Sequence, residues 1–222
     1  MKRISLIILA TLLFFKSYCT TAQNIPWTIT ISDSISENTR NLIFEITSEA
    51  QKELQEIFPD VHRPMQVIIS LDSAGTIAET GNAGFPLSLS AISFKIHPNH
   101  PIDMDSIISR YYKATLYHEY NHIVRGWTAE SSWQSNDFMD AVVAEGLATI
   151  FEVQFTHSKP LWSAYPQYVE NWVIELIKLP PSAYREYGKW MFEHPDGRKW
   201  IGYKAGTYIV EKALKKSGIP LE

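Results

Sequence analysis

The stretch that decides this fold reads LYHEYNHIV at residues 116–124 and contains the pattern H-E-x-x-H. Residues four apart on an α-helix lie on the same face, so His118 and His122 would direct their imidazoles to one point. Tetrahedral zinc takes two of its ligands in this way. Glu119 lies about 100° round the helix from His118, where it can take a proton from water without binding the metal. The stretch therefore predicts a zinc site with Glu119 as the catalytic base.

The residues that flank the two histidines argue against a solvated helix on the surface, which is the alternative interpretation. Leu116, Ile123 and Val124 are apolar, and apolar side chains on a helix predict that it is buried. Tyr120, within the motif, would face away from the metal and pack in the core.

A catalytic zinc site needs a third protein ligand and leaves one position for water. A third histidine six residues after His122 is excluded, because that position is Thr128. Glu145 is the favoured candidate, since it lies in the apolar run AVVAEGLATI at residues 141–150 and needs a counter-charge there. His157 is a weaker candidate. The alternative without a metal is a buried pair of Glu145 with lysine or arginine.

Small residues surround Glu145 on the helix that the pattern predicts for residues 137–155. Gly146 and the nearby alanines would let this helix approach the metal helix closely enough for one ion to bridge the two. Thr149 and Glu152 would share the helix face of Glu145, and we expect them to support the ligands through hydrogen bonds.

Three motifs give the chain a family resemblance: HEYNH at 118–122, EGLA at 145–148 and GYKAG at 202–206. Residues 65–216 resemble a gluzincin-type metallopeptidase. More narrowly, they are similar to a bacterial domain-of-unknown-function family of proposed zinc-dependent proteases. In that family we expect a further C-terminal segment, whereas this sequence stops soon after its last predicted helix.

This resemblance implies a zincin-like fold and hydrolysis of a peptide or protein substrate. It implies one Zn²⁺ ion, held by His118, His122 and Glu145. From its place in the GYKAG motif, Tyr203 would stabilise the oxyanion together with zinc. Packing of Tyr203 on a helix face is the alternative interpretation.

The first residues of the chain predict an export signal. Two basic residues precede an apolar run at residues 4–15, which is too short to cross a membrane as a helix. We expect residues 1–22 to be removed by cleavage between Ala22 and Gln23, giving a periplasmic or secreted protein. Lipid attachment at Cys19 is the second interpretation, because the residues before it form a poor lipobox. No later stretch predicts a transmembrane segment.

Composition excludes several functional classes. Cys19 is the only cysteine, so the exported chain would have no thiol nucleophile, thiolate ligand or disulfide. The formal net charge is −4 and no basic cluster predicts a nucleic-acid partner. Residues 23–222 are enough for one domain, with an N-terminal lobe of about 23–126 and a helical C-terminal lobe of about 127–222.

Hydrophobic periodicity predicts an α+β fold, with a small N-terminal sheet, the metal helix and further helices. A capping box of Ser34 with Glu37 begins a first helix that ends near residue 58. A half-exposed strand at 91–96 could form an edge that a peptide substrate joins. The remaining predicted elements are a strand at 65–71, a loop at 72–88, the metal helix at 102–125, a polar loop at 127–136 next to the expected cleft or on the surface, and helices at 137–155, 166–178, 183–192 and 200–216.

Two other functions stay open at this level. One is a metallopeptidase-like module that binds a peptide without cleaving it, although the retained Glu119 argues against that role. The other is a zinc hydrolase of a non-peptide amide, which would use the same metal chemistry. The sequence indicates neither the substrate preference nor the oligomeric state, and cobalt or manganese could replace zinc.

Overall fold

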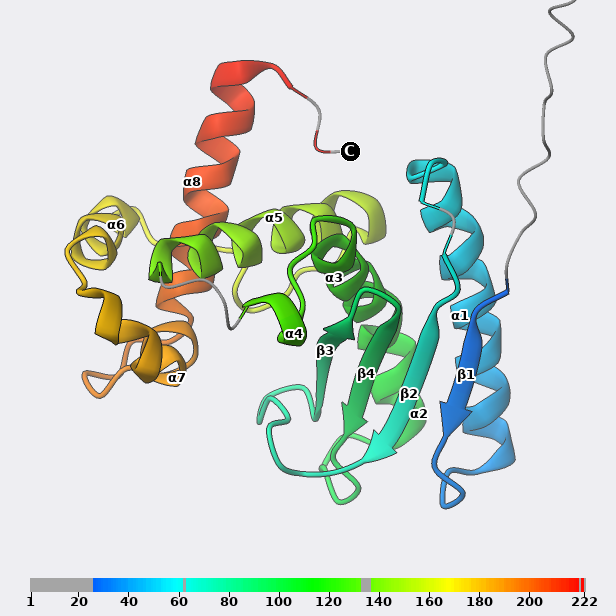
Figure 1. Ribbon diagram of the computed structural model, residues 1–222. Coiled ribbons are helices and arrows are strands. Elements are labelled where there is room, and N and C mark those ends of the chain that lie inside the picture. Colours follow the sequence, from blue (N-terminus) through cyan, green and yellow to red (C-terminus); the bar gives the residue numbers. More distant parts are fainter. Residues whose placement is uncertain (1–25, 62, 133–136, 220, 222) are drawn as a thin grey trace, which may run out of the picture.

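The computed structural model describes residues 26–61, 63–132, 137–219 and 221. The expected export signal, its cleavage site and Cys19 lie outside these residues. A four-stranded sheet lies beside a group of helices, and α1 to α3 cover one face of the sheet (Figure 1). The predicted α+β class is confirmed, and the likeness to the zincin fold stays a prediction.

The sheet has the strand order β1-β2-β4-β3. The strands are β1 (Thr28–Ile31), β2 (Gln66–Leu71), β3 (Asn82–Ser88) and β4 (Ala91–Ile96). β2 pairs in parallel with β1 and β4, and β3 pairs with β4 antiparallel. The strand predicted at 91–96 is confirmed as β4, but its predicted place at an edge is wrong, because β4 is paired on both sides. The edge is β3, which lies in the segment predicted as a loop.

β3 escapes a sequence pattern because it contains Gly84 and Pro86, residue types that are depleted in strands. The amide of His97 donates to the carbonyl of Gly81 over 2.8 Å. In an antiparallel pair, every second residue directs its N–H and C=O toward the partner strand, so Gly81, Ala83 and Phe85 direct these groups toward β4. Gly84 and Pro86 thus turn their backbone groups away from β4. Pro86 lacks an N–H, so at this outward position it removes no hydrogen bond from the sheet.

The first helix, α1 (Glu37–Ile57), begins two residues later than the predicted capping box implies. Ser36 is its N-cap, and the Ser36 hydroxyl accepts a hydrogen bond from the amide of Thr39 over 3.2 Å. The predicted cap at Ser34 is therefore wrong, while the predicted end near residue 58 is confirmed. The buried face of α1 includes Ile43 and Leu54, which pack in the core beneath the sheet.

The metal helix is a continuous helical run made of α2 (Met104–Ile107), a π-helical segment (Ile108–Tyr112) and α3 (Lys113–Val124). Asp103 caps its start by accepting from the amide of Ser106 over 2.9 Å. Gly126 follows its end with φ of 76°, a conformation that favours glycine. The predicted helix at 102–125 is confirmed, but nothing in the pattern predicts the π turn.

The helices predicted at 137–155, 166–178 and 200–216 are confirmed, but the one predicted at 183–192 is a 3-10 segment followed by a short α-helix, and a short helix, α4, lies in the predicted loop at 127–136. α5 belongs to both buried clusters, because Phe151 packs with the sheet and α3 while Val142 packs with the last helices. It therefore connects the two halves of the structure. The elements are α4 (Ala129–Ser132), α5 (Phe138–Thr156), α6 (Val169–Ile177), a 3-10 segment (Pro181–Glu186), α7 (Tyr187–Met191) and α8 (Ile201–Ser217).

α5 and α8 cross in backbone contact at two glycines. A Cβ atom on Gly206 would lie 2.0 Å from the carbonyl oxygen of Val142, and one on Gly146 would lie 2.3 Å from the carbonyl carbon of Gly206. Both distances are far below van der Waals contact. Gly146 follows Glu145 directly, so this crossing fixes the part of α5 that presents the carboxylate.

We expect Gly206→Ala to destabilise the protein by roughly 2 kcal/mol or more, since the helices must separate to admit the methyl group. Urea unfolding would measure this change. Gly188→Ala is the matched control, because a Cβ there meets only a side-chain atom of Phe192 at 3.9 Å. It should be neutral or stabilise by up to about 1 kcal/mol. Equal unfolding free energies for the Gly206→Ala variant and the parent would contradict the close crossing.

Candidate active site

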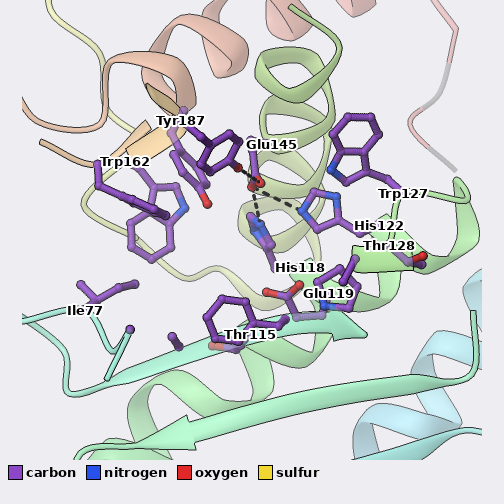
Figure 2. A pocket seen from close by; sticks show the side chains of 18 of the residues that line it. Ile77, Thr115, His118, Glu119, His122, Trp127, Thr128, Glu145, Trp162 and Tyr187 are labelled. Atoms are coloured by element: carbon purple, nitrogen blue, oxygen red, sulfur yellow. Dashed lines mark hydrogen bonds and ion pairs between the residues drawn. The ribbon is translucent and has the colours of Figure 1, made fainter. Parts of the chain in front are cut away.

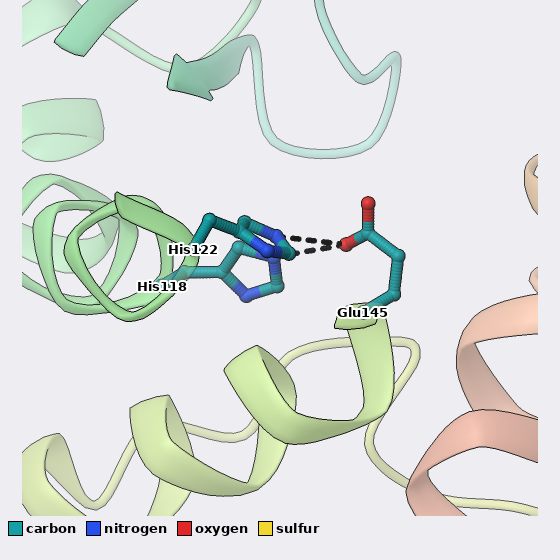
Figure 3. A group of neighbouring side chains, drawn as sticks. All are labelled: His118, His122 and Glu145. Carbon is teal, nitrogen blue, oxygen red and sulfur yellow. Dashed lines mark hydrogen bonds and ion pairs between the residues drawn. The ribbon is translucent and has the colours of Figure 1, made fainter. Parts of the chain in front are cut away.

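α3 carries the two motif histidines on one buried face. His118 and His122 are 7% and 3% exposed, and their ring centroids are 4.9 Å apart. α5 packs against α3 and presents Glu145, which is 6% exposed, to both rings (Figure 3). The sequence prediction that these three side chains meet is thus consistent with the coordinates.

The donor atoms of the three side chains converge on one point. Oε2 of Glu145 lies 3.1 Å from Nε2 of His118 and 3.3 Å from Nε2 of His122. Donor atoms bound to tetrahedral zinc at its usual bond lengths are about 3.3 Å apart. All three donor atoms lie within 4.8 Å of one another, and the group could hold a metal ion.

The charges of the site also favour a cation. Glu119, Glu145 and Glu152 are all buried. Among the residues that the structure describes, none of these carboxylates forms an ion pair with lysine or arginine. Three buried carboxylates share only two imidazoles as basic neighbours, and burial of excess negative charge is costly, so a divalent cation fits this donor set. The described residues contain no pair of Glu145 with lysine or arginine, which was the alternative without a metal.

Burial and neighbouring charges shift the pKa values of these groups in opposite directions. Burial lowers the pKa of His118, but Glu145 and Glu152 raise it more, so it lies well above its ordinary value. Burial raises the pKa of Glu145, yet the two histidines hold it well below its ordinary value. Burial also raises the pKa of Glu119, an effect that the histidines only partly oppose.

Glu152 supports His118 from the side opposite to Glu145. One of its oxygens lies 3.1 Å from Nδ1 of His118, and Ser158 donates to the other oxygen over 3.1 Å. This contact orients the imidazole so that Nε2 faces Glu145, as expected for Glu152. Thr149 was expected to act similarly, but its buried hydroxyl has no hydrogen-bond partner among the described residues.

Tyr187, on α7, is a site residue that the sequence did not indicate. Its hydroxyl donates to Oε1 of Glu145 over 3.0 Å, while Oε2 faces the histidines. The hydrogen bond therefore keeps one carboxylate oxygen directed away from the metal position. Tyr187 belongs to no motif and lies 42 residues from Glu145, so only tertiary packing, with α7 against α8 and the Tyr187 ring against Phe138 of α5, brings it here.

Tyr203, on α8, lines the same cavity as the histidines. Its ring centroid is 6.3 Å from that of His118, and burial together with the Glu145 carboxylate raises the pKa of its hydroxyl well above its ordinary value. The hydroxyl is thus a proton donor that stays protonated. Its predicted catalytic role stays a prediction.

Other candidate residues lie as follows. Tyr120 is buried and stacks on Trp27 with centroids 5.4 Å apart, so its predicted core position is confirmed. His157 is exposed at the end of α5 and is outside the group that could bind a metal. Trp127 and Thr128 line the cavity, as expected for the loop after the metal helix. Residues 133–136 of that loop lie outside the described residues.

A cavity of about 680 Å³ opens over Glu119 and the donor group, between β3 and the C-terminal helices (Figure 2). Gly84 of β3 lies directly against Glu119. A Cβ on Gly84 would be 2.6 Å from Oε1 of Glu119, so a residue without a side chain is needed for this close approach. The edge strand and the acidic side chain therefore face the same space.

We expect Tyr187→Phe to weaken zinc binding about 10- to 100-fold, because Glu145 loses the hydrogen bond that orients it. Competition with a zinc chelator of known affinity would measure the change. Tyr168→Phe is the control, because it removes the same hydroxyl group from a residue that precedes α6 and is 59% exposed. Unchanged zinc affinity in Tyr187→Phe would show that the hydrogen bond does not position the ligand.

Comparisons with known proteins agree with this geometry. A family model described as "Predicted Zn-dependent protease (DUF2268)" matches residues 43–222. No curated protein and no solved structure matches the chain. The match covers more than half of the chain and includes the histidines, Glu145 and Tyr203. The protein therefore belongs to this family of predicted zinc-dependent proteases.

Proposed function

We propose that the protein is an exported zinc metallopeptidase that hydrolyses peptide bonds. The observation that carries this proposal is the buried convergence of His118, His122 and Glu145 beside Glu119, in a cavity that opens onto the edge of the sheet. The three side chains would hold one zinc ion. Residues 1–22 would direct export, as the sequence predicts, with lipid attachment at Cys19 as the less favoured route.

In the proposed reaction, the bound zinc supplies a Lewis acid that makes water nucleophilic near neutral pH. Glu119 accepts the proton of the attacking water and then delivers it to the leaving amine. The hydroxyl of Tyr203 donates a hydrogen bond to the carbonyl oxygen as that oxygen gains negative charge. Tyr187 holds Glu145 in place throughout.

The free edge of β3 supports a peptide as the substrate. The N–H and C=O of Gly84 face outward from the sheet, beside Glu119. An extended peptide can pair with such groups and place a backbone carbonyl next to the catalytic side chains. A non-peptide amide would leave this edge unused, so the peptide substrate is favoured.

The same contacts argue against a module that only binds peptides. The side chain of Glu119 lines the cavity and forms no ion pair with a described residue. Its carboxylate is therefore free to accept a proton, which a catalytic base must do.

The described helices include none with the length and hydrophobicity of a membrane span.

We expect the protein to bind one zinc ion and to unfold at a higher temperature with zinc than after chelation, because binding stabilises the folded state. Elemental analysis and thermal unfolding would measure both. Glu145→Gln should lose most of the thermal shift, since it removes an anionic ligand. A full shift in this variant would exclude Glu145 as a ligand.

We expect Glu119→Gln to keep zinc but to hydrolyse peptides about 100- to 10,000-fold more slowly, because the amide cannot accept the proton. Rates on a mixed peptide library and the zinc content of the same preparation would be compared. Zinc content at the parental level is the internal control. Zinc-loaded parent protein that cleaves no peptide would overturn the peptidase proposal and favour the binding module.

A further inference from the structure

Beyond the metal group, the cavity has a wall of four aromatic side chains, which we call the aromatic slot: Trp162, Phe192, Trp200 and Tyr203. The ring centroid of Trp162 is 5.1 Å from that of Trp200 and 5.7 Å from that of Tyr203. Phe192 packs on the same two rings, at 5.7 Å and 6.2 Å. The four rings therefore form one continuous surface.

This surface is not simply part of the buried core. Phe192 is 42% exposed although it lies in the cavity. Ile77 lies at the same end of the cavity as Trp162 (Figure 2). A partly exposed apolar surface within a cavity is suited to a ligand.

The backbone holds two of these rings in a fixed position. Trp200 has φ of 61°, which is unusual for a bulky residue. Its amide donates to the carbonyl of Phe192 over 2.8 Å, and Glu193 and Lys199 form a β-bridge between them. The hairpin closed by these contacts keeps Phe192 and Trp200 side by side. A strained conformation that is held this firmly is consistent with a functional role.

The slot is next to the reacting centre. The ring of Tyr203 belongs to the slot, and its centroid is 6.3 Å from that of His118. A side chain in the slot would therefore belong to a residue beside the bond that is cleaved. A sugar ring would need several hydrogen bonds, whereas these walls are mainly carbon. An aromatic side chain matches the walls better, through ring-to-ring packing.

We propose that the aromatic slot binds an aromatic side chain of the substrate, directly beside the scissile peptide bond, and so sets the cleavage preference. This inference rests on the proposed peptidase function and adds the class of substrate. The ring of the substrate would pack against the exposed part of this aromatic wall, where Phe192 is accessible from the cavity. Phenylalanine, tyrosine or tryptophan would then be preferred at one fixed position.

The first test maps cleavage sites in a random peptide mixture by mass spectrometry, using the zinc-loaded protein. Aromatic residues should be enriched at a single position next to the cleaved bond. Two peptides that differ only by Phe or Ala at that position are then compared. For Trp162→Ala, the ratio of their kcat/KM values should fall about tenfold or more. Leu161→Ala is the matched control, because Leu161 is exposed and outside the cavity lining.

Phe192→Ala gives a second reading in case Trp162→Ala unfolds. Its Phe-to-Ala ratio should fall as well, because Phe192 belongs to the slot, and its 42% exposed side chain contributes less buried packing than a core residue. Cleavage without aromatic preference, or an unchanged ratio in both variants, would overturn the slot and leave the peptidase proposal standing.

Binding to the zinc-loaded Glu119→Gln variant separates the two proposals. Calorimetry should show tighter binding of the Phe peptide than of the Ala peptide, and Trp162→Ala in the same background should remove the difference. If this preference appears but the parent protein cleaves no peptide, the slot stands and the peptidase function fails. Equal binding of both peptides would overturn the slot.

Discussion

The structure depends on the burial of acidic side chains around two imidazoles. Glu119, Glu145 and Glu152 lie beside the histidines of α3, and the described residues supply no lysine or arginine to balance them. Carboxylates in such surroundings need a counter-charge. This one constraint explains why the donor atoms converge, why His118 is held from both sides, and why the family to which the chain belongs is described by zinc.

Close packing of α8 against α5 holds this arrangement in place. Glu145 lies one residue before Gly146, where α5 and α8 meet in backbone contact. α8 also carries Tyr203 to the cavity, so one helix crossing positions both a proposed ligand and a proposed catalytic hydroxyl. The hydrogen bond from Tyr187 adds α7 to the same group. Site and fold are therefore fixed by the same contacts.

The opposite wall of the cavity has a different origin. β3 forms the edge of the sheet, and Gly84 lets its backbone lie against Glu119. Pro86 is accommodated because its missing N–H would point away from β4. A strand with these residues would be weak at the centre of a sheet, but at the edge it leaves backbone groups free beside the proposed catalytic base.

The sequence by itself determined the elements whose signals are local. The spacing of His118 and His122 and the apolar run around Glu145 both depend on helix geometry, so the main helices and the donor group could be predicted. Only the tertiary structure decided that β3 is the edge strand. It alone brought Tyr187 to Glu145 and gathered the aromatic slot from separate segments, because contacts between distant residues leave no periodicity in the chain.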